Sequence, residues 1–161
     1  MYSINLEIPI VKNAGRVLDY YTEDTHVNLA LEESILRLHH KNDYLMTLRF
    51  WRNPKSVIVG RGQDITKEVV IKYCLENNIE IARRISGGGS VYHDEGNLNI
   101  SIFAPKQILE KGSEIVHVQR FFCDLLIKSL REMGFGVTRS NNTNIIFRGH
   151  KISGAASYFT K

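Results

Sequence analysis

Cysteine, proline and tryptophan are scarce in this chain of 161 residues, which holds two, three and one of them, respectively. Two cysteines cannot build a disulfide-stapled scaffold, and no Cys/His spacing matches a zinc site. Cys74 and Cys123 both fall in apolar stretches of predicted helices. We therefore expect two buried free thiols in a protein of the reducing cytoplasm.

Long apolar runs and blocks of like charge are also missing. No stretch approaches the ~18–20 apolar residues that span a bilayer, and the N-terminus lacks the basic-then-apolar pattern of a signal peptide. The net charge is +4, yet the basic residues are scattered rather than clustered. We expect neither a membrane nor a nucleic acid as partner, because an anionic nucleotide or an acidic carrier protein accounts for the charge equally well.

The rest of the composition is that of an ordinary folded protein. Hydrophobic residues make up 43% of the chain, and there is no internal repeat, low-complexity tract or linker. The length suits one domain with a sizeable core, so residues 1–161 are predicted to form a single domain.

Short strand-like runs alternate with three helical segments. The helices are predicted to begin at Asp24 or Thr25, at Thr66 and at Ser113, and the third ends near Met133, before Gly134. Their expected buried faces are Val27, Leu31, Ile35 and Leu38; Val69, Val70, Tyr73 and Cys74; and Val118, Phe121, Phe122, Leu125, Leu126 and Leu130. Strands are predicted over 3–11, 45–51, 56–60, 79–85, 89–93, 98–103, 136–139, 144–148 and 151–158. This order indicates an α+β fold, with a mixed or antiparallel sheet flanked by helices.

Three consecutive glycines, residues 87–89, follow the strand-like run 79–85 and precede the run 98–103, and Arg83 and Arg84 stand just before them. Because glycine has no Cβ, its backbone N–H groups can approach a ligand closely and its φ can be positive without strain. The planar donors of two arginines suit phosphate or carboxylate. The segment therefore predicts an anion-binding loop, with a plain glycine hairpin and solvated charges as the alternative.

Extended to Asn97, this segment resembles the signature of the lipoate-protein ligase family, Arg-Arg-x-Ser-Gly-Gly-Gly-x-Val-[Tyr/Phe]-His-Asp-x-Gly-Asn. Three other stretches are similar to family motifs: Asn-x-Ala-x-Glu-Glu within 26–38, Val-Gly-Arg-x-Gln at the end of 48–63, and Gly-His-Lys-Ile-Ser-Gly-Ala over 149–155. The resemblance spans nearly the whole chain.

The resemblance implies a biotin/lipoate-ligase-like catalytic domain, and with it a two-step reaction. The carboxylate of lipoate attacks the α-phosphate of ATP and releases pyrophosphate, and the ε-amine of a carrier-domain lysine then attacks the acyl-adenylate. Lipoate, ATP and a lipoyl carrier domain are thus the implied partners. Neither step needs a covalent nucleophile from the protein, but both need positioning and positive charge.

Lys151, in the Lys-Ile-Ser-Gly motif, is the expected catalytic residue, because a compact ammonium can touch both the lipoyl carbonyl and the α-phosphate. An ordinary strand lysine in solvent is the alternative. Arg84 is expected to face phosphate, with a surface ion pair as the alternative, and His93 to orient the loop or contact the acyl group. The predicted substrate- and nucleotide-binding residues are Arg84, Ser86, Gly87, Gly88, Gly89, Ser90, Val91, Tyr92, His93 and Lys151.

One departure from the family pattern concerns metal. Members carry an Asp shortly before the lysine motif, which helps to hold nucleotide or Mg²⁺, and Asn144 stands there in this chain. Asparagine lacks the charge that a hard divalent cation prefers. We therefore predict no metal-ligating residue, and Mg²⁺ stays an open alternative as a cofactor beside ATP.

The second departure is length, because the chain stops ten residues after Lys151, whereas family catalytic domains continue with further strands and helices. A split gene with a completing partner chain, a shortened paralogue and a fragment are three explanations. A sheet that ends here exposes an edge, so we expect the isolated chain to self-associate or to need an accessory chain.

Three functions stay open on this basis. ATP-dependent lipoate ligation is favoured. Octanoyl or lipoyl transfer without ATP is the second, although transferases that read like ligases place a cysteine upstream of the lysine motif and residues 133–147 contain none. The third is a non-catalytic protein that binds lipoate, an adenylate or a carrier domain.

Overall fold

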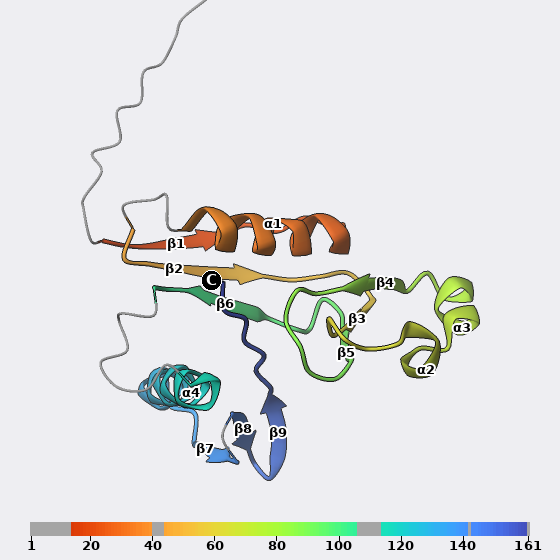
Figure 1. The fold of residues 1–161 in the computed structure, drawn as a ribbon. Coiled ribbons are helices and arrows are strands. Elements are labelled where there is room, and N and C mark those ends of the chain that lie inside the picture. Colours follow the sequence, from red (N-terminus) through yellow and green to blue (C-terminus); the bar gives the residue numbers. More distant parts are fainter. Residues whose placement is uncertain (1–13, 40–43, 106–113, 142, 161) are drawn as a thin grey trace, which may run out of the picture. The chain divides into compact units, whose positions relative to one another are not determined.

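The computed structural model describes residues 14–39, 44–105, 114–141 and 143–160 (Figure 1). The strand predicted over 3–11 and the helix start predicted at Ser113 lie outside the described residues. The chain groups into two compact units, and the single domain stays a prediction. Unit 1 takes its described residues from Met1–Val59, Asp64–Arg83 and Ser90–Pro105, and unit 2 from Gly60–Gln63, Arg84–Gly89 and Lys106–Lys161.

Two mixed three-stranded sheets run through unit 1. In the first, β2 (Met46–Trp51) lies between parallel β1 (Gly15–Asp19) and antiparallel β6 (Asn99–Phe103). In the second, β3 (Ser56–Val59) lies between parallel β4 (Glu80–Arg83) and antiparallel β5 (Val91–His93). With the helices, these sheets confirm the predicted α+β class. The sequence does not predict β1, because its five residues are only partly apolar and pairing with β2 decides their conformation.

Helix α1 (Thr25–Leu38) begins where Asp24 caps it, as predicted. The Oδ1 of Asp24 accepts a hydrogen bond from the amide of Val27 at 2.9 Å. The predicted apolar face is only partly correct, since Val27 and Leu38 are exposed and the buried residues of the helix are Thr25 and Asn28. The inward face of α1 is therefore built around polar contacts.

The helix predicted from Thr66 is wrong as a single element. It is two short helices, α2 (Ile65–Glu68) and α3 (Ile71–Glu76), with extended backbone at Val69, whose φ and ψ are −132° and 131°. A β-branched valine gains little in a helix. Here Val69 instead packs with Val59 and Cys74 in a buried cluster.

Unit 2 contains α4 (Ile115–Glu132) and an antiparallel sheet of β7 (Val137–Ser140), β8 (Asn144–Phe147) and β9 (His150–Ser153). Its core is the buried cluster Cys123, Ile127, Val137 and Ile145. Cys123 and Cys74 are both buried and free, as predicted. On α4 the predicted face is too wide, because Phe121 and Leu125 are exposed while Ile127 faces β7 and β8.

The end of α4 follows the prediction. The amides of Gly134 and Phe135 donate to the carbonyls of Arg131 and Leu130, each at 3.0 Å, and Gly134 has a φ of +92°. This is a Schellman cap, which needs a left-handed residue at that position. The strand predicted over 151–158 is too long, because Ser153 pairs with Ile145 near the start of β8 and few partner residues follow. None of the described helices combines the length and apolarity needed to cross a membrane.

A buried ion pair in unit 1 yields a stability prediction. The Nη1 of Arg49, whose side chain is 1% exposed, lies 2.6 Å from the Oε1 of Glu32, and burial raises the pKa of Glu32. Glu32→Ala would leave the guanidinium buried without its counter-charge, so we expect the free energy of unfolding to fall by about 3–5 kcal/mol.

Urea denaturation would measure this loss, and the neighbouring residue supplies a matched control. Glu33 forms an exposed pair with Arg37 one turn along the helix, so Glu33→Ala should cost about 0–1 kcal/mol. Equal losses in the two variants would contradict the assignment of a buried pair.

Candidate functional site

The guanidinium of Arg84 organises the glycine loop, Arg84–Gly89, from within. Its Nη2 donates to the carbonyl oxygens of Gly87 at 2.7 Å and Gly89 at 2.8 Å, and its Nε donates to the Oγ of Ser86 at 3.2 Å. Burial lowers the pKa of Arg84 from its ordinary value, yet an arginine stays protonated in proteins. The loop is thus folded around a fixed positive charge. Contact between Arg84 and phosphate stays a prediction.

The hydrogen bonds of this loop fix the direction of two amides. Every peptide bond of the described loop is trans, so the N–H that follows a carbonyl points to the opposite side. The carbonyl of Gly87 faces Arg84, and the carbonyl of Ser86 accepts the Arg61 amide at 2.9 Å. The N–H groups of Gly88 and Gly87 therefore point away from these partners. Amide donors turned outward beside a half-buried cation suit an anion.

The turn after β3 supports the glycine loop through direct backbone packing. A Cβ added at Gly60 would lie 2.1 Å from the carbonyl oxygen of Gly88, so only glycine fits there. Gly88 itself has a φ of +95°, which also favours glycine. The Oε1 of Gln63 accepts the Gly60 amide at 2.7 Å and closes the turn. The turn formed by the Val-Gly-Arg-x-Gln sequence thus packs directly against the glycine loop and supports it.

Arg61, in the same turn, also contacts the segment that follows β9. Its guanidinium carbon lies 5.6 Å from the centroid of the Tyr158 ring, and its Nη1 lies 3.5 Å from the Tyr158 hydroxyl. The backbone amide of Arg61 is the donor to Ser86. One residue therefore contacts the glycine loop with its backbone and the chain beyond the lysine motif with its side chain.

Lys151 is positioned by a different element of unit 2, the β8–β9 hairpin. Arg148 and Gly149 reverse the chain with φ values of 48° and 81°, the signs of a type I′ turn. The register slips between Ile145 and Ile146, and Lys151 and Ile152 are both exposed. The Nζ of Lys151 lies 3.6 Å from where a Cβ on Gly154 would be, so the ammonium extends over this glycine of the same motif.

The remaining predicted site residues lie in unit 1, on β5 and just before it. Val91 and Tyr92 are exposed, and the Oγ of Ser90 donates to Glu68 at 3.4 Å. His93 is held differently, because its Nδ1 lies 3.1 Å from the Nδ2 of Asn53 and its ring meets that of Trp51 edge to face at 6.3 Å. The structure thus brings the loop residues together in unit 2 and anchors His93 separately in unit 1.

The described residues do not fit a metal site built by the protein. Asn144 is the first residue of β8 and pairs with Ser140, and its amide offers one neutral oxygen. In the described part of the chain, no three His, Cys, Asp or Glu side chains are grouped to hold an ion. Mg²⁺ commonly reaches nucleotide enzymes through substrate phosphates, so we assign it no step on this chain.

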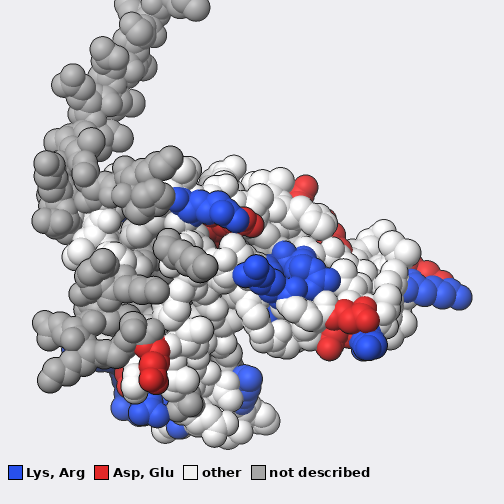
Figure 2. Space-filling model, viewed as in Figure 1, with Lys and Arg blue, Asp and Glu red and all other residues white. Residues whose placement is uncertain are grey.

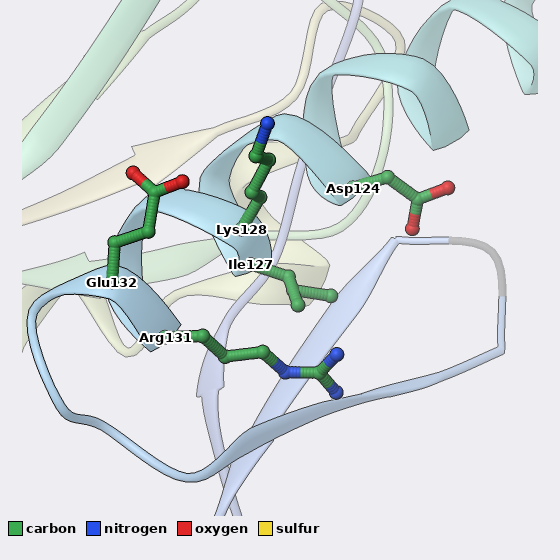
Figure 3. Close-up of a pocket in the computed structure, with 5 residues that line it drawn as sticks. All are labelled: Asp124, Ile127, Lys128, Arg131 and Glu132. Carbon is green, nitrogen blue, oxygen red and sulfur yellow. The ribbon is translucent and has the colours of Figure 1, made fainter.

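A hollow on α4 contains none of the predicted site residues. It has a volume of about 480 Å³ and is lined by Asp124, Ile127, Lys128, Arg131 and Glu132 (Figure 3). Two of the charged side chains that line it are already hydrogen-bonded to other residues. Arg139 donates to both carboxylate oxygens of Asp124 at 2.6 and 2.8 Å, and Arg131 donates to the carbonyl of Val137. Figure 2 shows one face of the molecule, on which Lys and Arg gather in several small patches.

Comparison with known proteins shows to which family this chain belongs. Residues 24–161 match the family model described as the lipoyl protein ligase A/B catalytic domain. The chain belongs to this family. It is 37% identical over 139 residues to lipoate-protein ligase LplJ of Bacillus subtilis (strain 168), covering 86% of this chain and 40% of that ligase.

Solved lipoate-protein ligases share the fold. A lipoate-protein ligase A bound with ATP superposes with a TM-score of 0.80 at 34% identity, covering 92% of this chain and 62% of that one. A bi-partite lipoate protein ligase of Thermoplasma acidophilum, described with its E2 lipoyl domain, gives a TM-score of 0.76 at 30% identity, covering 93% of this chain and 57% of that one. The chain therefore spans about 40–60% of the length of these family members.

Sequence reasoning missed the residues that support the site. Gly60, Arg61 and Gln63 hold the glycine loop, and Asn53 holds His93, yet none was predicted to belong to the site. The signal for Gly60, Arg61 and Gln63 was present, because the Val-Gly-Arg-x-Gln stretch resembles a lipoyl ligase motif.

Proposed function

We propose that this chain activates lipoate with ATP and passes the lipoyl group to a lysine of a lipoyl carrier domain. The observation that carries the proposal is the glycine loop, which is wrapped around Arg84 and turns the amides of Gly87 and Gly88 outward. Membership of the lipoyl ligase family and the likeness to an ATP-bound lipoate-protein ligase support it.

The proposed chemistry follows from charge and geometry. A carboxylate oxygen of lipoate bonds to the α-phosphorus of ATP while the bond to pyrophosphate breaks. Negative charge grows on the phosphate oxygens, where the outward amides of the loop and the Lys151 ammonium would stabilise it. The neutral ε-amine of the carrier lysine then attacks the acyl carbon, AMP leaves with the electron pair, and the amine loses a proton to solvent.

Acyl transfer through a cysteine thioester is disfavoured by the state of both thiols. Cys74 and Cys123 are 4% exposed, and burial, with a smaller contribution from the charge of Asp124, raises the pKa of Cys123. A buried thiol with a raised pKa is a poor nucleophile. Transfer without ATP would therefore have to proceed through Lys151 alone.

Lipoate-dependent exchange of radiolabelled pyrophosphate into ATP tests the proposal, and mass spectrometry of an added lipoyl domain tests the second step. We expect exchange and a lipoyl-sized mass increase on the domain. Because a similar ligase is bi-partite, both assays should be repeated with the second subunit of such a ligase. Tight lipoate binding without exchange in either condition would contradict an activating enzyme and favour a binding protein.

A further inference from the structure

Two buried asparagines of unit 1 form a hydrogen-bonded chain that ends on His93. Asn28 of α1 and Asn53, which follows β2, are 0% and 2% exposed. The Nδ2 of Asn28 lies 2.9 Å from the Oδ1 of Asn53, whose Nδ2 lies 3.1 Å from the Nδ1 of His93. Amides this deeply buried need their hydrogen bonds, and their orientation follows from their partners.

Backbone groups around Asn28 fix which atom donates and which accepts in each of these hydrogen bonds. The amide of Thr22, which can only donate, lies 2.8 Å from the Oδ1 of Asn28. The carbonyls of Thr22 and Arg52, which can only accept, lie 2.7 and 3.0 Å from its Nδ2. These contacts distinguish the oxygen of Asn28 from its nitrogen. Asn28 therefore presents its donor to Asn53, and Asn53 accepts with Oδ1.

The orientation of the Asn53 amide in turn determines which ring nitrogen of His93 carries the proton. Asn53 turns its Nδ2 donor toward His93, so the Nδ1 of His93 accepts, and a neutral imidazole that accepts at Nδ1 carries its proton on Nε2. We infer that Asn28 and Asn53 are positioning residues that hold His93 as the Nε2–H tautomer, in which Nε2 is a hydrogen-bond donor and the ring removes no proton. The reaction that would depend on this donor is the lipoate activation of the proposed function, on which the role of His93 rests.

The plane of the ring is held by a second set of contacts. Trp51, 5% exposed, meets His93 edge to face with an interplanar angle of 76°. The Nε1 of Trp51 donates to the Oγ of Ser101 at 2.8 Å, and Ser101 in turn donates to Glu32. Asn28 and Glu32 belong to the Asn-x-Ala-x-Glu-Glu stretch of α1. That stretch thus reaches His93 by two routes, which accounts for the polar inward face of the helix.

Nitrogen NMR of protein labelled in its histidines tests the tautomer without any turnover. Long-range proton–nitrogen correlations of His93 should show an unprotonated Nδ1 and a protonated Nε2 at neutral pH. In Asn53→Leu, the same spectra should show a mixture of tautomers. A proton on Nδ1 in the unsubstituted chain would overturn the inference, whether or not the chain exchanges pyrophosphate.

Kinetic measurements show whether His93 acts as a hydrogen-bond donor or as a general base. His93→Gln keeps an N–H near the Nε2 position, so its kcat for pyrophosphate exchange should stay within about tenfold, whereas His93→Leu should lose about 10²–10³-fold. Asn53→Leu should lower kcat by about tenfold or more with KM for ATP nearly constant. His117→Gln, on the exposed side of α4, should match the unsubstituted chain. Equal losses in His93→Gln and His93→Leu, with both variants folded, would overturn the donor role.

Discussion

Gly60→Ala is expected to suppress lipoate-dependent pyrophosphate exchange by about 100-fold, although Gly60 itself carries no side chain and no charge. The new methyl group would overlap the backbone of Gly88, 2.1 Å from its oxygen and 3.1 Å from its carbonyl carbon. A backbone atom cannot rotate aside as a side-chain end can. The glycine loop must therefore shift, and its outward amides move with it. Overpacking of this kind also costs about 1–3 kcal/mol of stability.

A glycine two residues further along the same turn provides the control. A Cβ at Gly62 would meet no atom within 4 Å. Gly62→Ala should therefore keep exchange and change the free energy of unfolding by no more than about 0.5 kcal/mol. Circular dichroism and urea denaturation would establish that Gly60→Ala is folded under assay conditions. A folded Gly60→Ala with the exchange rate of Gly62→Ala would show that the loop is not the phosphate site.

Lys151→Ala is expected to lower pyrophosphate exchange by about 10²–10³-fold, or below detection, while the fold is retained. The ammonium is the charge that the proposal assigns to the meeting point of the carboxylate and the α-phosphate. Its side chain is exposed and extends over Gly154, so its loss removes little packing. Exchange kinetics with lipoate and ATP, beside a thermal melt, would measure both effects.

Two further lysine variants sharpen this test. Lys151→Arg keeps the charge but replaces a compact ammonium by a broad planar fork, so it should recover only part of the activity. Lys72→Ala removes an exposed lysine that pairs with Glu76 on α3 and should leave exchange unchanged. Exchange in Lys151→Ala at the rate of Lys72→Ala would remove Lys151 from the mechanism.

Short-range sequence patterns were enough to predict most of the helices and strands. Asp24 caps α1 and Gly134 ends α4 as expected, because capping involves only a few consecutive residues. The predictions failed where distant residues decide the conformation. Val69 leaves the helical path to join a buried cluster with Val59, and β1 exists because it pairs with β2. The over-long strand from Lys151 stops because its partner β8 begins near Ile145.

By itself the sequence determined the α+β class, the two buried thiols, the resemblance to lipoate-protein ligases and the glycine loop with arginines before it. These are properties of composition, of short-range periodicity and of an unbroken motif. Only the tertiary structure decided that the guanidinium of Arg84 folds inward to clamp its own loop, that Gly60 must be glycine because of Gly88, and that Asn28 and Asn53 orient His93. The contacts of Gly60 and of the two asparagines join segments whose meeting depends on strand pairing and packing, whereas Arg84 bonds residues of its own loop. No local pattern encodes which partner a hydrogen-bond donor will find.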